Sequence, residues 1–428
     1  IQPGSRSEGF PLVMAFPSTR HEIHYGNRLV RCFAERPVNI DAAFRQSARK
    51  FGERTALILG EERVAYRELE ERVGNIAANL LALGLQRGDR VALLLGNGIP
   101  FVETILATAR AGLIAVPMNT RQRMPEIEYV LNQCSACVAI VDSEYVANLP
   151  GREATPSLRH VFQVGGRAAS FDELKRKTQK RGFSEIGEEE VFCLLYTSGT
   201  TGRPKGAMLT HLGTVHSIMH FRHAFDLGEQ DVGVLAVPAS HVTGLVAIIL
   251  TMLSTGGATV LMPAFKARSF LEIAQQERMS YTLIVPAMYN LCLLDPDFRA
   301  FDLSSWRIAG FGGAPMPEAT IARLLEAMPD LSLRNCYGST ETTSPATILP
   351  DGAISHHRDS VGRELPCADV VVVDECGREV PRGHGGELLI GGPMVVPGYW
   401  DNDSANRSAF VAGYWVSGDI GSKDEAGF

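Results

Sequence analysis

The hydrophobic positions along the chain change period several times, and each change marks a different predicted element. Between residues 64 and 83, apolar side chains recur every three or four positions, and Gly84 follows where a helix C-cap belongs. This pattern predicts a helix. Continuous apolar runs at 91–95 and 113–117 then bracket a second helical stretch. Such runs are typical of strands buried on both faces of a parallel sheet.

A second alternating series of strands and helices is predicted from residue 191 onward. After about residue 349, short apolar runs separated by turn residues indicate a small β-rich unit. We therefore expect an α/β fold, with two doubly wound α/β subdomains and a small barrel-like β-rich subdomain. The expected units are residues 14–190 and 191–349, both α/β, and the β-rich 350–428.

Two segments of the first 190 residues have no periodic pattern. Residues 1–13 lack periodicity and caps, so we expect them to be disordered or foreign to the native protein, with Met14 as the native start. The polar stretch 149–190 is expected to be a linker or a surface excursion.

Composition narrows the class of protein. The chain has 428 residues, 45% hydrophobic and 21% charged, which is typical of a globular protein of about two to four domains. Its 41 Lys and Arg against 48 Asp and Glu give a net charge of −7, so we expect no nucleic-acid partner, which would need a clustered basic excess. No apolar run reaches the roughly 18 residues of a membrane span.

Cysteine and histidine spacing gives no metal site. Among eight cysteines only Cys134 and Cys137 form a CxxC pair, and we interpret them as small side chains leading into a strand. His216, His220 and His223 have helical spacing without a carboxylate that completes a zinc pattern, which favours a surface or packing role. The cysteine usage fits a cytoplasmic protein.

The strongest chemical signal is YTSGTTGRPKG, residues 196–206, directly behind a predicted buried strand. Its glycines allow close backbone approach, and its hydroxyls, exposed amides and lysine suit a polyphosphate. A flexible linker is the disfavoured alternative. The motif GxxxxGK[ST] of a P-loop NTPase is missing from the chain. The residues expected to bind phosphate are Thr197, Ser198, Gly199, Thr200, Thr201, Gly202 and Lys205.

This segment, followed by AMLTH, resembles the phosphate-binding signature of the adenylate-forming superfamily, which includes the acyl-CoA synthetases. Further segments resemble later family motifs in the right order: PASHVTG (238–244), GFGGAP (310–315), YGSTET (337–342), GELLIGGPMVVPGYW (386–400) and YWVSGD (414–419). The resemblance implies the large N-terminal domain of an AMP-forming acid–CoA ligase. Such an enzyme uses ATP and Mg²⁺ to convert a carboxylic acid into an acyl-adenylate, and then passes the acyl group to coenzyme A.

The resemblance also implies roles for single residues. Glu341 is expected to hold Mg²⁺, although a helix N-terminal carboxylate is an alternative interpretation. Thr340 is expected to contact the α-phosphate, Asp419 to accept hydrogen bonds from the ribose, and His241 to lie beside the reacting carboxylate; His241, Thr340 and Glu341 are the expected catalytic residues. The expected adenine site comprises Gly312, Gly313, Ala314, Pro315, Tyr337 and Gly338.

The lack of an acidic residue in one motif narrows the class of substrate. Amino-acid-activating members of the family usually carry Asp in the segment corresponding to 238–244, and this chain has no acidic residue there. We therefore expect an aliphatic or aromatic acid rather than an α-amino acid. The expected pocket residues are His241, Val242, Gly244, Phe311, Gly312, Thr342 and Thr343.

Several expectations concern the whole protein. Complete family members continue into a C-terminal lid with a catalytic lysine, and we expect that lid to be absent from this chain and its adenylation to be slow. Two other functions remain open: a stand-alone adenylation domain that loads a carrier-protein thiol, and a non-catalytic protein that binds nucleotide or acyl-adenylate. The expected partners are the acid, coenzyme A and a second copy in a homodimer.

Overall fold

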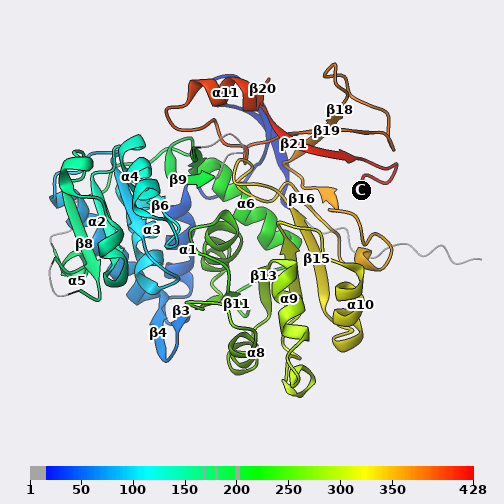
Figure 1. Ribbon diagram of the computed structural model, residues 1–428, viewed down its shortest axis with the longest axis horizontal. Coiled ribbons are helices and arrows are strands. Elements are labelled where there is room, and N and C mark those ends of the chain that lie inside the picture. Colours follow the sequence, from blue (N-terminus) through cyan, green and yellow to red (C-terminus); the bar gives the residue numbers. More distant parts are fainter. Residues whose placement is uncertain (1–15, 167–168, 179–181, 198–202) are drawn as a thin grey trace, which may run out of the picture.

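The computed structural model describes residues 16–166, 169–178, 182–197 and 203–428. Within these residues the strands form sheets of six, nine and four strands and a two-stranded hairpin. Figure 1 shows the two large sheets side by side, with α1, α3 and α6 between them and the small sheet above. This arrangement confirms the expected α/β class with an added β-rich part.

The six-stranded sheet has the order β10-β9-β6-β5-β7-β8. Strands β5 to β9 are parallel where they pair, and β10 runs antiparallel to β9. Its strands are β5 (Arg90–Leu94), β6 (Ile114–Pro117), β7 (Val138–Asp142), β8 (His160–Val164), β9 (Val191–Thr197) and β10 (Lys205–Thr210). Since β5 and β6 are buried on both faces, their sequences are continuously apolar, as predicted.

The nine-stranded sheet has the order β17-β16-β15-β14-β13-β11-β12-β3-β4. The six strands from β15 to β3 in that order are parallel. Its strands are β3 (Thr55–Leu59), β4 (Glu62–Ala65), β11 (Val232–Leu235), β12 (Ala258–Leu261), β13 (Tyr281–Ile284), β14 (Ile308–Gly312), β15 (Ser332–Tyr337), β16 (Thr347–Ile348) and β17 (Arg363–Glu364).

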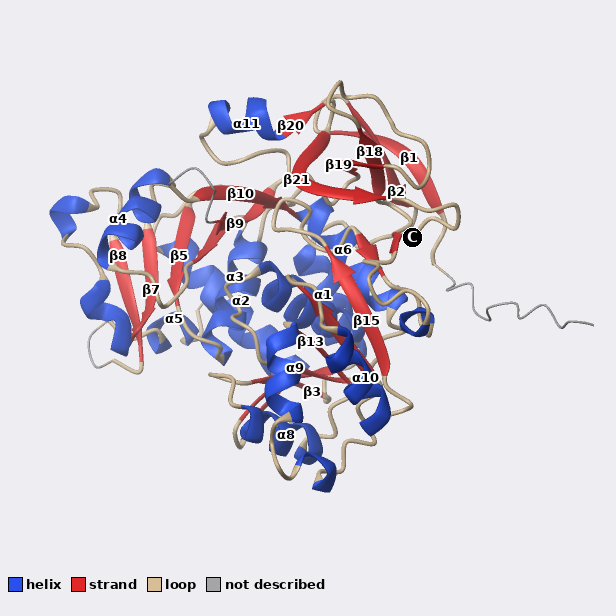
Figure 2. Ribbon diagram, turned by 45° about the vertical axis from the view of Figure 1, so that its right-hand side comes forward, coloured by secondary structure: helices blue, strands red, loops and turns tan. Residues whose placement is uncertain are grey.

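The small sheet is antiparallel, with the order β18-β19-β21-β20. Figure 2 shows the hairpin β1–β2 beside it, although the two are at opposite ends of the sequence. The strands are β1 (Thr19–His24), β2 (Arg28–Phe33), β18 (Asp369–Val373), β19 (Gly385–Gly391), β20 (Phe410–Val411) and β21 (Tyr414–Ser422). Arg28 of the hairpin donates to the carbonyls of Val396 and Pro397, at 3.2 and 3.0 Å, and so ties the two regions together.

The helices cover the sheets and fill the space between them. α3 is buried almost all round because it packs between α2 and its own sheet, which explains its largely apolar sequence. The helices are α1 (Ile40–Lys50), α2 (Tyr66–Ala82), α3 (Ile99–Ala111), α4 (Met124–Gln133), α5 (Asp172–Lys175), α6 (His211–Ala224), the π-helix η3 (Thr243–Leu250), α7 (Thr251–Thr255), α8 (Ala267–Gln276), α9 (Pro286–Leu293), α10 (Glu318–Ala327) and α11 (Asp403–Ala409), with short 3₁₀ turns η1 (Ser143–Asn148), η2 (Arg152–Ala154), η4 (Phe298–Ala300) and η5 (Ala353–Ser355).

Two sequence expectations differ from the structure. The interpretation of 149–190 as only a linker or excursion is wrong in part, because β8 lies within it and forms an edge of the six-stranded sheet. Strand membership also crosses residue 190: β3 and β4 join the nine-stranded sheet, while β9 and β10 join the six-stranded one. The pairing of strands that are far apart in the sequence is set by tertiary packing, and local periodicity carries no information about it. The division into folding units at 190 and 349 stays a prediction.

His216, His220 and Cys134 have packing roles. His216 and His220 are buried in α6, and Nε2 of each lies within hydrogen-bond distance of a backbone N–H, that of Phe33 for His216 and that of Cys367 for His220. Cys134 is buried just ahead of β7, and all eight cysteines are free thiols.

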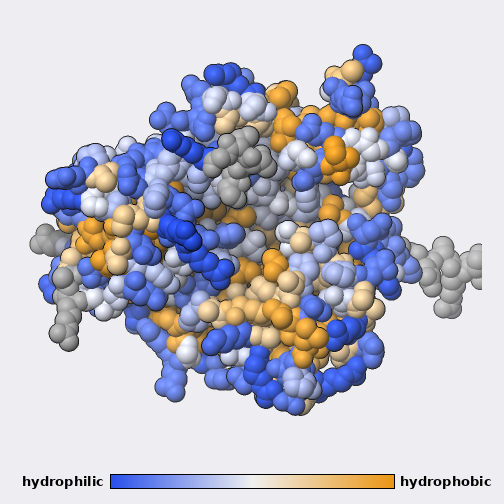
Figure 3. All heavy atoms as spheres, viewed as in Figure 1, coloured by the Kyte–Doolittle hydropathy of each residue, from blue (hydrophilic) through white to orange (hydrophobic). Residues whose placement is uncertain are grey.

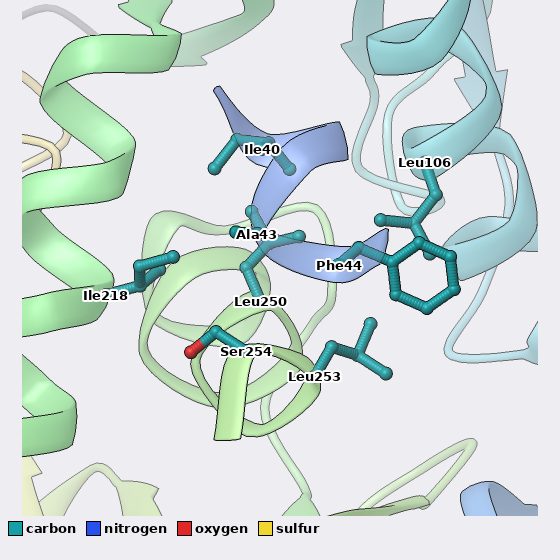
Figure 4. Close-up of a pocket in the computed structure, with 8 residues that line it drawn as sticks. All are labelled: Ile40, Ala43, Phe44, Leu106, Ile218, Leu250, Leu253 and Ser254. Carbon is teal, nitrogen blue, oxygen red and sulfur yellow. The ribbon is translucent and has the colours of Figure 1, made fainter. Parts of the chain in front are cut away.

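One small cavity lies among the helices between the two large sheets. A cavity of about 10 Å³ lies between α1, α3, α6 and α7, lined mainly by apolar side chains such as Phe44 and Leu253 (Figure 4). None of the predicted site residues lines it. Figure 3 shows a mostly hydrophilic surface with apolar patches, and Leu291 and Leu294 at the end of α9 are 50% and 62% exposed. Among the described residues, no helix is both long and apolar enough to cross a membrane.

Candidate active site

The predicted motifs come together at one edge of the nine-stranded sheet. Because β11, β14 and β15 are parallel members of one sheet, their carboxyl ends lie at the same edge. The segment with His241 follows β11, the segment 313–315 follows β14, and Glu341 follows β15. The crevice outside the carboxyl ends of parallel strands is where open α/β sheets usually bind ligands.

Glu341 is an almost buried carboxylate, 6% exposed, and it lies in a turn rather than at the start of a helix. The helix N-terminal interpretation therefore does not apply. Its Oε1 accepts a hydrogen bond from the Tyr399 hydroxyl at 2.8 Å, and its Oε2 accepts one from the Ser339 hydroxyl. Each carboxylate oxygen has a second lone pair beyond these bonds. Thr340, next to it, is half-buried.

A strap formed by residues 393–400 connects Glu341 to the return strand of the phosphate loop. The Val396 N–H donates to the Glu341 carbonyl at 2.9 Å, and the Trp400 N–H donates to the Gly206 carbonyl at 2.8 Å. Lys205 Nζ, at the start of β10, lies 5.2 Å from the centroid of the ring of Tyr399 in the strap, a geometry in which the ring face attracts a cation. Tyr399 thus contacts both Glu341 and Lys205.

The phosphate loop is described only at its ends. Thr197 ends β9 and Lys205 begins β10, and the two are paired across the antiparallel ladder. The predicted phosphate ligands Ser198, Gly199, Thr200, Thr201 and Gly202 lie outside the described residues.

Tyr337 and Asp419 connect the nine-stranded sheet to the small sheet. The Tyr337 hydroxyl donates to Asp419 Oδ2 at 2.7 Å, from the end of β15 to β21. Burial, together with the adjacent carboxylate, raises the pKa of the Tyr337 hydroxyl, so it stays protonated at neutral pH. Asp419 is exposed, and Tyr337 bonds only its Oδ2. The structure therefore brings these two predicted nucleotide residues into contact.

The predicted adenine segment has a backbone that only glycine fits at one position. A Cβ on Gly312 would lie 2.4 Å from the Cys336 carbonyl oxygen of β15, and Gly313 has a φ of +74°. Gly313, Ala314 and Pro315 are exposed, while Gly338 opens the turn before Glu341 and is half-buried. The tight turn after β14 is therefore present and the backbone at 313–315 is exposed, while the contact with adenine stays a prediction.

The His241 segment is short and tightly folded. The His241 N–H donates to the Pro238 carbonyl at 3.1 Å, and its own carbonyl accepts from the Leu245 N–H at 2.9 Å. The side chain keeps an exposed surface, yet surrounding protein atoms partly desolvate it and lower the pKa of the imidazole. It is therefore neutral at pH 7. The segment leads into the π-helix η3, a type of element frequent at functional sites.

The expected acid pocket is only partly open to a ligand. Val242 is half-buried and Gly244 is buried, whereas Phe311, 1% exposed, belongs to the core. Thr342 and Thr343 are fully buried. Their hydroxyls bond to the backbone of Ser339 and to the Met394 carbonyl. The two threonine hydroxyls are thus occupied by protein.

Sequence reasoning assigned no role to three residues that support the site. Tyr399 lies in a motif that was recognised, but its contact with Glu341 depends on the folding of the strap. Ser339 bonds the same carboxylate. Asn97, which bonds to the His241 segment, carries no signal in the sequence around it.

The oxygen groups around Glu341 fit a magnesium ion. Mg²⁺ is bound by oxygen ligands, usually one or two carboxylates together with substrate phosphates and water. Glu341 supplies one carboxylate, and the Ser339 and Thr340 hydroxyls lie beside it in the turn. The donor set is suited to a metal shared with a triphosphate rather than to a closed protein site.

Comparison with known proteins supports the motif assignment. The model of the AMP-binding enzyme family matches residues 44–400, and a WXXGXW repeat in two copies matches 394–416. A feruloyl-CoA synthase from Amycolatopsis sp is 33% identical over 374 residues, 87% of this chain and 74% of that protein. The long-chain-fatty-acid–CoA ligase FadD13 of Mycobacterium tuberculosis is 31% identical over 369 residues, 86% of this chain and 72% of the ligase.

A solved structure has the same fold. The N-terminal domain of FACL13 from Mycobacterium tuberculosis superposes with a TM-score of 0.85 at 28% identity, covering 91% of this chain and 98% of that domain. The fold and the ordered motifs define the large domain of an adenylate-forming enzyme. The chain belongs to the AMP-binding enzyme family, within the AMP-forming acid–thiol ligases.

Proposed function

We propose that the protein activates an aliphatic or aromatic carboxylic acid as an acyl-adenylate and then transfers the acyl group to coenzyme A. The observation that carries this proposal is the convergence of the His241 segment, the Gly312–Gly313 backbone and Glu341 at one sheet edge. The family membership supports the nucleotide chemistry, and the convergence of these segments supports a single site for the nucleotide and the acid.

In the first half-reaction, an oxygen of the acid carboxylate attacks the α-phosphorus of ATP, and pyrophosphate leaves. Lys205 and the hydroxyls of the phosphate loop hold the departing phosphates, and Thr340 holds the α-phosphate. When bound, Mg²⁺ neutralises charge on the phosphate oxygens. Glu341 would hold that ion through its remaining lone pairs, with its carboxylate fixed by Tyr399 and Ser339.

The remaining residues orient the two substrates. Asp419 holds the ribose hydroxyls through the oxygen that Tyr337 leaves free, and the Gly312–Gly313 backbone passes beside the adenine. Neutral His241 donates a hydrogen bond to the acid carboxylate without trapping it as an ion pair. In the second half-reaction, the coenzyme A thiolate attacks the acyl carbonyl and AMP leaves.

The acid is proposed to be neutral apart from its carboxylate. Residues 238–244 contain no carboxylate to pair with a substrate ammonium, and the relatives described above are named for an aromatic acid and for long-chain fatty acids. Val242, which follows His241, is apolar and keeps a partly exposed surface. Such a side chain suits an alkyl chain or an aromatic ring.

The test is thermal stabilisation of this chain by AMP and by non-hydrolysable acyl-adenylate mimics with alkyl or aryl groups. We expect AMP to raise the melting temperature and one acyl class to raise it further. Failure of both ligands would overturn the proposal. Glu341→Gln should abolish the additional stabilisation that MgCl₂ gives with ATP while leaving AMP binding intact. The acceptor is tested separately, by comparing coenzyme A with a carrier protein in turnover assays.

We also propose a cytoplasmic location. All eight cysteines are free thiols, as is usual in a reducing compartment. The homodimer stays a prediction.

A further inference from the structure

Asn97 connects the two large sheets through one side chain. It follows β5 in the six-stranded sheet and lies just ahead of α3. Its Nδ2 donates to the carbonyls of Val237 and Met262, each at 2.9 Å, and its Oδ1 accepts from the Ala239 N–H at 2.7 Å. The three bonds fix the orientation of the amide, because two partners are carbonyls and the third is a donor.

The three partners lie at the ends of neighbouring strands of the other sheet. Val237 and Ala239 belong to the segment that follows β11, and Met262 follows β12, the parallel neighbour of β11. The Asn97 loop is itself held, since the Gly96 N–H donates to Asp142 Oδ2 at 2.7 Å at the end of β7. A continuous set of hydrogen bonds therefore runs from β7 to the β11 segment.

From this anchor to His241 the chain has little freedom. Ala239 is two residues from His241, and the His241 N–H donates to the carbonyl of Pro238, the residue just before Ala239. On the other side, a Cβ on Gly244 would lie 2.3 Å from the Pro238 carbonyl oxygen, so η3 packs directly on the segment. The position of His241 is thus set by Asn97 on one side and by η3 on the other.

We propose that Asn97 is a positioning residue for the part of the site that binds the acid. It fixes the segment that follows β11, and with it His241, at the position where the substrate carboxylate meets the nucleotide. The inference rests on the proposed function. The amide of Asn97 bonds to Val237, Ala239 and Met262, and these bonds do not reach the nucleotide segments 312–315 and 337–341. The inference therefore requires that Asn97 affects only the acid part of the ligand.

Asn97→Asp is the most informative variant because it keeps the shape of the side chain but replaces the N–H donors with an oxygen. The carboxylate can still accept from the Ala239 N–H, but it has no donor for the two carbonyl oxygens that it faces. Asn97→Ser removes the same bonds without adding charge, and it serves if the aspartate variant does not fold. Asn79 provides a matched control: its Nδ2 also donates to two carbonyls, of Leu174 and Arg176. These bonds join α2 to α5, away from β11 and β12 (Figure 1).

The experiment measures the affinity of each variant for AMP and for the acyl-adenylate mimic that stabilises the wild type best. We expect Asn97→Asp to bind AMP within about twofold of the wild type and the mimic roughly tenfold more weakly, which is about 1.4 kcal/mol. Asn79→Asp should change neither affinity. With turnover, the Asn97 variants should raise KM for the acid and leave KM for ATP unchanged.

Two results would overturn the inference while the proposed function stands. One is an equal loss of AMP and mimic affinity in the Asn97 variants, which indicates a general structural role. The other is unchanged affinity for the mimic. If the wild type binds neither ligand, the proposed function fails and this inference fails with it.

Discussion

The hydroxyl of Tyr399 lies 2.8 Å from Oε1 of Glu341 and donates a hydrogen bond to it, while the face of the same ring lies 5.2 Å from Lys205 Nζ. Burial and the Glu341 carboxylate raise the pKa of this hydroxyl, so it remains a donor at neutral pH. One side chain therefore links the lysine at the end of the phosphate loop to the carboxylate expected to hold magnesium.

Tyr399→Phe is expected to lower kcat/KM for MgATP by roughly tenfold or more, because a hydrogen bond to a charged group contributes about 1.5–3 kcal/mol. The phenyl ring keeps the contact with Lys205, so the variant isolates the hydroxyl. Steady-state assays at saturating acid measure the effect. Tyr414→Phe is the control, since it removes a hydroxyl bonded to Asp369 in the small sheet. Equal rates for the two variants would remove Tyr399 from the site.

Asp419→Ala is expected to weaken AMP binding by about 1.5–3 kcal/mol for each lost charge-assisted hydrogen bond. Calorimetric titration with AMP measures this loss. Tyr337→Phe removes only the Tyr337–Asp419 bond and should cost less. If both variants lose the same affinity, Asp419 acts only by holding Tyr337, and it is not a ribose ligand.

Gly244→Ala is expected to destabilise the fold by about 1–3 kcal/mol, the usual cost of overpacking a tight contact. The added methyl would lie 2.3 Å from the Pro238 carbonyl oxygen, and backbone atoms on both sides cannot move independently. Urea unfolding measures the change in the free energy of unfolding. Gly228→Ala is the control because a Cβ there meets nothing within 4 Å. Indistinguishable midpoints would contradict the predicted crowding.

Stability should fall in mild acid because of buried neutral histidines. Burial lowers the pKa of His216 to about 3, whereas an unfolded histidine titrates near 6.5. As pH falls below about 6.5, the unfolded state takes up a proton that the folded state binds only near pH 3. The free energy of unfolding therefore decreases by up to about 1.4 kcal/mol per pH unit for this group.

His216→Gln should flatten this dependence between about pH 6 and pH 4, when urea unfolding is followed at a series of pH values. His211, whose pKa burial lowers to about 4, should give the same effect over a narrower range when replaced by Gln. A slope that is the same in both variants and in the wild type would show that these histidines do not contribute.

Local sequence patterns predicted where strands and helices form better than they predicted which strands pair with each other. The continuous apolar runs at 91–95 and 113–117 became β5 and β6, and the three-to-four periodicity became α2. The same patterns could not show that β3 pairs with β12, about 200 residues later, since any buried parallel strand has the same apolar character.

The candidate site was likewise predictable where a local motif marks a residue, and not where a role depends on distant contacts. The sequence motifs named Tyr337, Glu341 and Asp419, and the structure joins Tyr337 to Asp419. Asn97 carried no signal, because its role depends on Ala239, 142 residues away. An asparagine ahead of a helix is common in any protein, so only the folded geometry distinguishes this one.

The bonds from Arg28 to the strap join residues 368 and 369 positions apart. During synthesis the hairpin is made long before the strap, so the carbonyls that Arg28 bonds are added only after the strands of both large sheets. The strap that carries Tyr399 therefore cannot take its final position until these later residues have been made. A chain cut between residues 365 and 392 would contain the described strands of the two large sheets, but its Arg28 guanidinium would lack both of these carbonyl partners.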